Sequence, residues 1–294
     1  MSVKQLYFQY TIKKTCVKSF LSLRLKHRDW CAVLNENKQY KDKHKGERCF
    51  ILGNGPSLKT DDLKKLEDEF VFSVNQIARH PDFEHIKPTY HFWADENFFV
   101  VDETKPEDLE LLENMKKVKT PDNSPECFFP IQQKPFIEKY NLDADLKINY
   151  FYTGLCFYDG YDSEIDYTKV VPGFGTVVQW CITMAIYMGF SEIYLLGCDN
   201  TSLVTTIKSA LKSNNDSDYV YNITENEKKR MESLLERTPL EAYIREYLNT
   251  FVGYRNLFYY CEKRSIKLVN CSSTTVIDSI PRDTLINVLK NNKR

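Results

Sequence analysis

The sequence lacks the features that define several classes of protein. None of its apolar runs approaches the roughly 20 residues that a membrane-spanning helix needs, so we expect no integral membrane protein. Its nine cysteines are odd in number and irregularly spaced, and they include no CxxC pair. This pattern predicts buried free thiols in a reducing cytoplasm rather than disulfides or a zinc site. No clean apolar segment precedes small residues near the N-terminus, so we expect no signal peptide.

The chain also lacks an excess of charge of either sign. Forty Lys and Arg stand against 41 Asp and Glu, which gives a net charge of −1. Neutralising nucleic-acid phosphates needs a basic excess, so we expect no nucleic-acid partner for the chain as a whole. The 294 residues, 42% hydrophobic and 28% charged, are typical of a soluble globular enzyme with one or two domains.

Basic charge is concentrated at the N-terminus. Residues 1–48 hold 12 Lys and Arg against 4 Asp and Glu, and no acid occurs from Met1 to Arg28. Apolar residues lie between these charges, a pattern that suits an anionic membrane surface; a solvated helix docked on the body is the alternative. We expect a basic helical arm and polar linker over 1–46 and a catalytic domain over 47–294. The protein is expected in the cytoplasm, with peripheral membrane contact through residues 1–28 as one option.

Short apolar runs alternate with helical patterns along the rest of the chain. Runs that predict strands lie at 49–52, 70–74, 90–94, 192–196 and 266–269. Helical patterns cover 58–66, 176–188 and 225–263, the last broken near Pro239. This alternation predicts an α/β fold with a mostly parallel, Rossmann-like sheet and helices on both faces. Residues 105–170 are less regular and are expected to form an insertion, and the polar stretch 208–226 is expected to form a lid.

A small polar residue follows each predicted strand. The residues are Asn54, Asn75, Asp95, Asp199 and Asn270. Asn and Asp favour turns for local reasons, but the carboxyl edge of an open α/β sheet is also where ligands bind. Five such residues on one edge indicate a binding site there.

The turn Gly53–Leu58 is the first candidate for that site. Glycines let a backbone approach an anion closely, and the free N–H groups of a following helix favour negative charge. Ser57 is a candidate cap of that helix. The turn is neither GxGxxG nor a Walker A loop, and a tight turn without a ligand is the alternative interpretation.

Three sequence blocks resemble a known superfamily. CFILGNGPSL followed by FSVNQI resembles the opening of the bacterial lipooligosaccharide sialyltransferases. It also resembles the wider superfamily that includes the flagellin-glycosylating motility accessory factors and the 6-hydroxymethylpterin pyrophosphokinase-like proteins. GTVVQWCITMAIYMGFSEIYLLGCD (175–199) and, more weakly, IKLVNCSS (266–273) resemble the same superfamily. The resemblance implies a Rossmann-like, GT-A-like sialyltransferase variant with a lid.

The resemblance also implies a donor and the residues that bind it. In the sialyltransferases, the matching positions hold the cytidine nucleotide of CMP-sialic acid, and catalysis is inverting and independent of metal. The resemblance therefore implies a nucleotide-sugar donor with no other cofactor, and no metal ligands. The implied nucleotide-binding residues are Gly53, Asn54, Gly55, Ser57, Asn75, Thr176, Gly197 and Asp199.

The chain departs from the sialyltransferases at the catalytic positions. It has no histidine after His91, whereas that family takes its general base from a histidine in the lid. Asp218 stands near the expected histidine, and Asp95 replaces an Asn after the third strand. A carboxylate can deprotonate a sugar hydroxyl, so both are candidate catalytic bases. The tyrosines expected after Gly197-Cys198-Asp199 are absent; Tyr219 and Tyr221 are candidate substitutes.

Three functions remain open at the level of sequence. The first is a glycosyltransferase of bacterial surface polysaccharide biosynthesis that uses a CMP-linked, sialic-acid-like donor and a glycan or lipid-linked oligosaccharide acceptor. The second is a phosphotransferase of the pterin pyrophosphokinase kind, using ATP and Mg²⁺ with Asp95. The third is a non-catalytic nucleotide-binding module.

Overall fold

The computed structural model describes residues 19–24, 30–156, 164–210, 223–235 and 239–290. Within these residues, eight strands form one sheet in the order β6-β5-β4-β3-β2-β1-β7-β8, and each neighbouring pair is parallel. The expected α/β fold with a parallel sheet is therefore confirmed. The strands are β1 (Arg48–Leu52), β2 (Phe70–Val74), β3 (Tyr90–Phe92), β4 (Glu126–Pro130), β5 (Lys147–Cys156), β6 (Val170–Gly173), β7 (Glu192–Leu196) and β8 (Lys267–Asn270).

The strand order reverses direction once, between β1 and β7. From β1 the chain adds strands outward through β6, then returns to place β7 on the other side of β1, in register from Arg48↔Glu192 to Leu52↔Leu196. The strand order therefore reverses at the carboxyl edge between β1 and β7, where the loops that leave these two strands lie side by side. Open α/β sheets bind their ligands at such a point.

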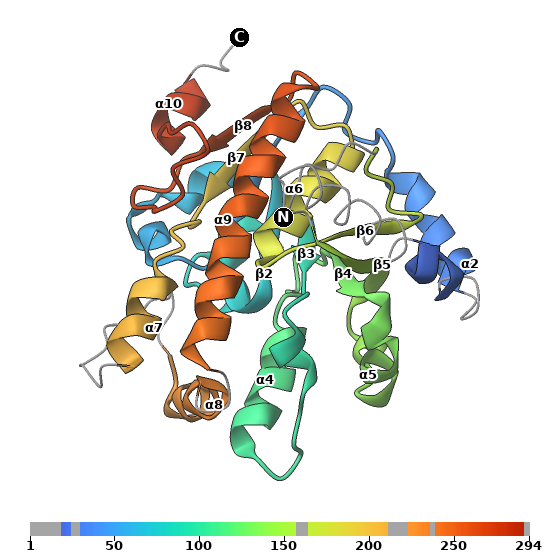
Figure 1. Ribbon diagram of the computed structural model, residues 1–294, viewed down its shortest axis with the longest axis vertical. Helices are drawn as coiled ribbons and strands as arrows, with labels where there is room; N and C mark the ends of the chain where they lie inside the picture. Colours follow the sequence, from blue (N-terminus) through green and yellow to red (C-terminus); the bar gives the residue numbers. More distant parts are fainter. Residues whose placement is uncertain (1–18, 25–29, 157–163, 211–222, 236–238, 291–294) are drawn as a thin grey trace, which may run out of the picture.

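Helices cover both faces of the sheet (Figure 1). The α-helices are α2 (Trp30–Asn35), α3 (Phe83–Ile86), α4 (Pro106–Lys116), α5 (Lys134–Lys139), α6 (Val177–Tyr187), α7 (Ser202–Ala210), α8 (Glu225–Leu235), α9 (Leu240–Glu262) and α10 (Leu285–Lys290), and residues 19–24 are also helical. The 3-10 helices are η1 (Glu36–Tyr40), η2 (Pro56–Thr60), η3 (Leu63–Leu66), η4 (Asn75–Arg79), η5 (Glu96–Phe99), η6 (Ile131–Gln133) and η7 (Leu142–Ala144). No helix in the described part of the chain is long and apolar enough to cross a membrane.

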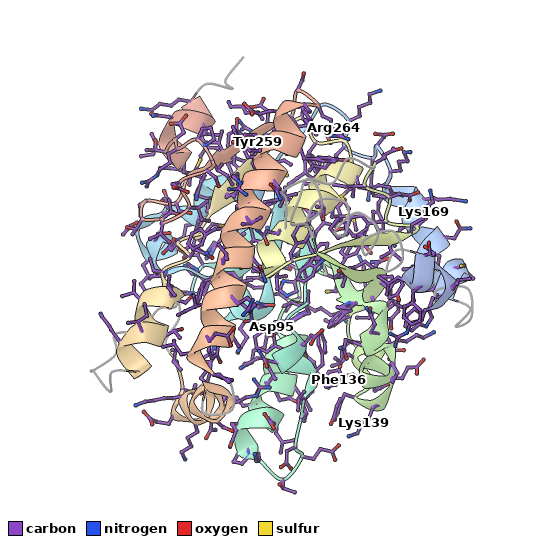
Figure 2. All side chains as sticks on the ribbon, in the orientation of Figure 1. Asp95, Phe136, Lys139, Lys169, Tyr259 and Arg264 are labelled. Atoms are coloured by element: carbon purple, nitrogen blue, oxygen red, sulfur yellow. The ribbon has the colours of Figure 1, made fainter. Side chains whose placement is uncertain are left out.

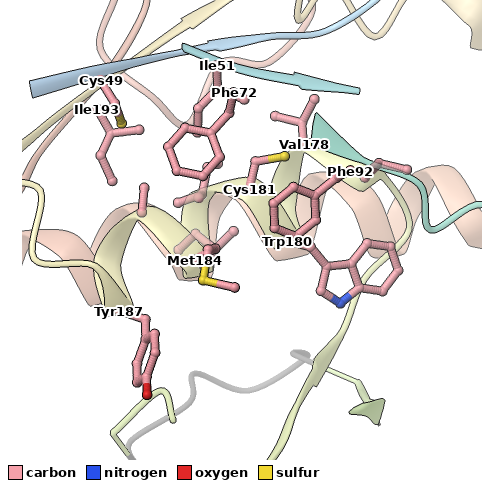
Figure 3. Close-up of a cluster of buried hydrophobic side chains, with 14 of the residues drawn as sticks. Cys49, Ile51, Phe72, Phe92, Val178, Trp180, Cys181, Met184, Tyr187 and Ile193 are labelled. Atoms are coloured by element: carbon pink, nitrogen blue, oxygen red, sulfur yellow. The ribbon is translucent and has the colours of Figure 1, made fainter. Parts of the chain in front are cut away.

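The alternation of side chains along the strands divides the core into two layers. On one face, α6 packs against the central strands, and Figure 3 shows Cys181 and Met184 of this helix beside Cys49, Ile51 and Phe72. Ten of the eleven residues of α6 are buried, although its sequence has little amphipathic character. A helix that is apolar all round is typical of a position between a sheet and a second helix. Here the second helix is α9.

The first helix predicted from the sequence is wrong. Residues 58–66 do not form one α-helix but the two 3-10 helices η2 and η3, separated at Asp61 and Asp62. Pro56 fixes the start of η2, and the backbone at Asp61 is extended. The three predicted core leucines, Leu58, Leu63 and Leu66, are nevertheless fully buried.

Residues 36–46 differ from the polar linker that their composition suggests. Asn37 is buried and donates hydrogen bonds to the carbonyl oxygens of Tyr150 at 2.8 Å and Tyr167 at 2.9 Å. Tyr40 is also buried, and its hydroxyl donates to Glu126 at 3.1 Å. Long-range polar contacts therefore attach this segment to the sheet. Similarly, residues 105–170 contribute β4 and β5 to the same sheet rather than a separate unit.

Candidate active site

The turn after β1 lies against the end of β7 at the carboxyl edge of the sheet. The backbone N–H of Gly53 donates to the Leu196 carbonyl and that of Gly55 to the Gly197 carbonyl, both at 2.8 Å. A Cβ atom at Gly53 would lie 2.4 Å from the carbonyl oxygen of Gly197. Gly197 itself has a φ of +62°, which other residues rarely adopt. These three glycines therefore allow two loops to meet backbone to backbone.

Asp199 closes this turn from the β7 side. It is 1% exposed, and its Oδ2 accepts a hydrogen bond from the backbone N–H of Ser57 at 2.8 Å. Its Oδ1 accepts a short hydrogen bond from the Ser57 hydroxyl. Burial raises the pKa of Asp199, and the two hydrogen bonds from Ser57 partly offset this. A Cβ at Gly55 would lie within 2.7 Å of the carboxylate, so only glycine fits there.

Unpaired amide atoms gather where β1, β2 and β7 end. Asn54 Oδ1, Asn75 Oδ1 and Asn200 Nδ2 are each buried without a hydrogen-bond partner. Asn75 and Asn200 also have positive φ values, +50° and +56°. Buried polar atoms are normally satisfied, so three orphaned ones at the ends of neighbouring strands indicate a place for the polar groups of a ligand. Asp61 adds a fourth, its Oδ2; burial and the nearby Asp199 raise its pKa.

Thr176 stands at the N-terminus of α6, as the sequence predicts. Its backbone is extended, and its hydroxyl interacts with Tyr254 rather than capping the helix. The preceding Gly175 lies against α9, since a Cβ there would be 2.3 Å from Thr250 Oγ1 and 3.3 Å from the Glu246 carbonyl oxygen. The N-terminus of α6, with its free N–H groups, therefore lies between the sheet edge and α9.

Asp95 lies just past β3, half-buried, and begins η5. Its Oδ1 accepts a hydrogen bond from the backbone N–H of Asn97 at 2.9 Å. Burial raises the pKa of Asp95, whereas its hydrogen bonds with Asn97 and the charge of Arg230 lower it. Figure 2 shows Asp95 beside the lower part of α9. Glu246 of α9 has a pKa raised by burial, and the charges of Asp95 and Glu96 raise it further.

Of the predicted lid 208–226, the structure describes 208–210, which end α7, and 223–226, which lead into α8. Paired charges hold α8 to the body. Glu227 pairs with Arg79, and both side chains are 11% exposed. Gln76 Nε2 donates to the same Glu227 carboxylate at 3.0 Å. Arg230 Nε donates to Asp108 Oδ1 of α4 at 2.6 Å. A helix rich in charge thus docks through paired charges on α4 and η4, below the lower end of α9 (Figure 1).

The structure places the predicted residues unevenly. Gly53, Gly55, Ser57, Gly197 and Asp199 meet in one turn, with Asn54 and Asn75 beside it. The candidate base Asp218, as well as Tyr219 and Tyr221, lies outside the described residues. Among the described residues, no group of three or more His, Cys, Asp and Glu side chains is arranged to hold a metal.

Sequence reasoning missed four side chains near the site. Asn200 could have been found, because it directly follows the Gly-x-Asp at the end of β7. Asp61, Arg230 and Glu246 carried no such signal: Asp61 lies between η2 and η3, and the other two reach the edge from α8 and α9.

The chain is similar to one described family and to several solved structures. The model of the family described as 6-hydroxymethylpterin diphosphokinase MptE-like matches residues 28–202. A search of curated proteins finds no match.

Two of the similar structures are of the sialyltransferase CstII from Campylobacter jejuni. The complex with CMP-3FNeuAc has a TM-score of 0.41 at 18% identity, over 80% of this chain and 85% of that chain. The complex with cytidine-5'-monophosphate has a TM-score of 0.42 at 19% identity, over 81% and 85%. The MAf glycosyltransferase from Magnetospirillum magneticum AMB-1 has a TM-score of 0.46 at 16% identity, over 85% of this chain but 38% of that chain.

Proposed function

This chain belongs to the family described as 6-hydroxymethylpterin diphosphokinase MptE-like, and we propose that it uses this fold as a glycosyltransferase with a nucleotide-activated donor. The observation that carries the proposal is the set of unpaired amide atoms of Asn54, Asn75 and Asn200, where β1, β2 and β7 end. Two oxygens and one N–H suit the hydroxyl and ring groups of a nucleoside, which both donate and accept hydrogen bonds. The resemblance of the first two sequence blocks to the sialyltransferases favours a CMP-linked, sialic-acid-like donor.

The proposed roles follow from the positions of the groups. The N-terminus of α6 offers backbone N–H groups to the donor phosphate, whereas the N–H groups of Gly53, Gly55 and Ser57 are already bonded to Leu196, Gly197 and Asp199. The acceptor oxygen forms a bond to the anomeric carbon as the bond from that carbon to the nucleotide phosphate breaks and its electron pair leaves with the phosphate. Asp95 takes the acceptor proton. Burial raises the pKa of Asp95, which brings a carboxylate base closer to the working pH.

A second candidate function is supported by the family description. A diphosphokinase-like reaction would bind ATP and Mg²⁺ at the same edge, with Asp95 beside the metal rather than acting as a base. Carboxylate oxygens are ligands that Mg²⁺ prefers. The same site residues would then serve phosphoryl transfer.

A thermal-shift panel separates the two. CMP, CDP, UDP, GDP and ATP are each added with EDTA and with Mg²⁺, because a ligand of the native state raises Tm by mass action. We expect CMP or CDP to raise Tm in EDTA, and N54A or N75A to abolish the shift while the exposed N287A on α10 keeps it. A shift with ATP only in the presence of Mg²⁺ would overturn the glycosyltransferase in favour of phosphotransfer.

The catalytic base is then identified by two isosteric variants. With the nucleotide sugar indicated by the panel, D95N is expected to lose about a hundredfold or more in kcat, as for a general base, while it still binds the nucleotide. D218N is the matched variant: a loss confined to D218N would move the base to that residue. Full activity of both, with nucleotide binding intact, would indicate a binding module or another base.

We place the acceptor at a membrane surface. In the helical segment 19–24, Leu21 is buried against β5 near Gly154, whereas Phe20 and Leu23 are 63% and 66% exposed. Two exposed apolar side chains within a stretch that carries basic but no acidic residues suit an anionic bilayer. We expect the chain to sediment with phosphatidylglycerol vesicles but not with phosphatidylcholine vesicles. The double variant F20S/L23S should weaken this binding; equal binding to both vesicles, or none, would contradict the proposal.

A further inference from the structure

The turn that carries Asp95 is held from outside by a side chain of α8. Within the turn, the N–H of Asn97 donates to Asp95 Oδ1. The guanidinium of Arg230 donates a short hydrogen bond to the carbonyl oxygen of Asn97 and another, at 3.3 Å, to that of Val100. One nitrogen of the guanidinium, Nη2, thus contacts two carbonyl oxygens of this turn, one of them two residues away from Asp95.

Arg230 is itself fixed by a buried partner. Its Nε donates to Asp108 Oδ1 at 2.6 Å, and the two side chains are 12% and 9% exposed. The other oxygen of Asp108 accepts from the N–H of Asp102 at 2.9 Å. Arg230 therefore connects α8, α4 and the segment that follows β3 through charge-assisted hydrogen bonds.

The charged groups that face Asp95 come from three elements. Glu96 lies next to it in η5, and Glu246 approaches from α9. Arg230 of α8 is the cation that acts on Asp95. The positive charge of Arg230 lowers the pKa of Asp95, although less than the hydrogen bonds with Asn97 do.

We propose that Arg230 is a positioning residue that couples the docking of α8 to the shape and charge of the Asp95 turn. When α8 is docked, the guanidinium fixes the carbonyls of η5 and faces the Asp95 carboxylate with a positive charge. When α8 is released, both effects are lost together, and the charges of Glu96 and Glu246 are left uncompensated. The base is thus active only while α8 covers the carboxyl edge. This role in catalysis rests on the proposed function, whereas the coupling itself does not need a substrate.

The coupling is tested by the titration of Asp95 in the full chain. In protein labelled with ¹³C-carboxyl aspartate, the Asp95 resonance is the one absent from D95N. We expect R230Q to shift the titration of this resonance toward higher pH, because the positive charge no longer favours the ionised form. R230K keeps a charge but not the planar fork, so its shift should be smaller. K229Q removes an exposed charge from the same helix and should titrate as the wild type.

A second readout separates positioning from simple loss of structure. Amide exchange of Asn97–Val100 should be faster in both R230Q and R230K than in K229Q, because neither side chain can bond Asp108 and the two carbonyls together as the Nε and Nη2 of Arg230 do. The circular dichroism spectrum should stay unchanged if each variant folds. A folded R230Q with the wild-type Asp95 titration would overturn the proposal, as would equal shifts in R230Q and R230K.

Activity distinguishes this inference from the proposed function. If Asp95 is the base, the acid limb of the kcat/KM profile should move toward higher pH in R230Q, with a further loss of about tenfold from misplacement of the turn. If D95N retains full activity while R230Q still shifts the Asp95 titration, the base assignment fails and the coupling stands. If D95N is inactive and R230Q leaves the titration unchanged, the coupling fails and the base assignment stands.

Discussion

Two aspartates with the same local motif show how the fold sets their chemistry. Asp95 and Asp102 each accept a hydrogen bond from the backbone N–H two residues later, at 2.9 and 3.1 Å. The pKa of Asp102 is lowered by the hydrogen bonds from Thr104, whereas burial raises that of Asp95. The turn chemistry is readable from sequence. The burial that makes one carboxylate a candidate base is not, because it depends on α8 and α9.

This contrast predicts how D95N changes stability. Because the pKa of Asp95 is higher in the folded state, that state binds more protons above about pH 4, and stability falls as pH rises through this range. D95N keeps the Oδ1 acceptor and removes the disfavoured charge, so its Tm should exceed that of the wild type by about 2 °C at neutral pH. The difference should vanish near pH 3.5. D102N, where the folded-state pKa is lowered, should have the opposite sign; a drop in Tm for D95N at neutral pH would contradict this account.

Among the elements, compact apolar runs and long helical patterns were predictable from the sequence, whereas three strands of mixed composition were not. β1, β2 and β7 lie within one residue of their predicted bounds because each is a compact apolar run. β4, β5 and β6 were missed: β5 interleaves polar residues with aromatic ones, and β6 contains Pro172. The break between α8 and α9 near Pro239 is confirmed.

Two buried charge pairs hold α8 to the body, and we expect its docking to depend on them. E227Q leaves Arg79, 11% exposed, without its full counter-charge, and breaking a buried pair costs about 3–5 kcal/mol. We therefore expect amide exchange in α8 to accelerate by at least about tenfold while the central strands stay protected. E241Q, which breaks an exposed pair with Arg245 on α9, is the matched control. Unchanged exchange of α8 in E227Q would show that apolar contacts hold this helix.

For the whole molecule, the sheet order and the place of residues 30–46 could not be deduced from the sequence. Which strand lies beside β1 depends on a contact 144 residues away in sequence, Leu52↔Leu196. The segment 30–46 looks polar, yet Leu34 is fully buried and Asn37 bonds to carbonyls 113 and 130 residues distant. Local patterns carry no information about such partners.

Truncation tests the contribution of this segment. A chain that starts at Glu47, where the sequence places the domain boundary, loses the buried Leu34, Asn37 and Tyr40. Losing two large buried side chains costs several kcal/mol, so we expect Tm to fall by roughly 10 °C or the protein to become insoluble. A chain that starts at residue 19 keeps Leu21 and should melt close to the full-length protein. Equal melting temperatures for all three would place the boundary at Glu47 after all.

The return of the chain to β1 also has a consequence for synthesis on the ribosome. β1 lies inside the sheet, between β2 and β7, but β7 ends only at Leu196. Until that point has left the exit tunnel, one side of β1 is an open edge that another chain could pair with. Pairings of such high sequence separation form slowly. The nascent chain is therefore most exposed to aggregation while only its first two thirds have been made. The proposed ligand site forms only after that, when the residues that follow β7 can meet the turn after β1.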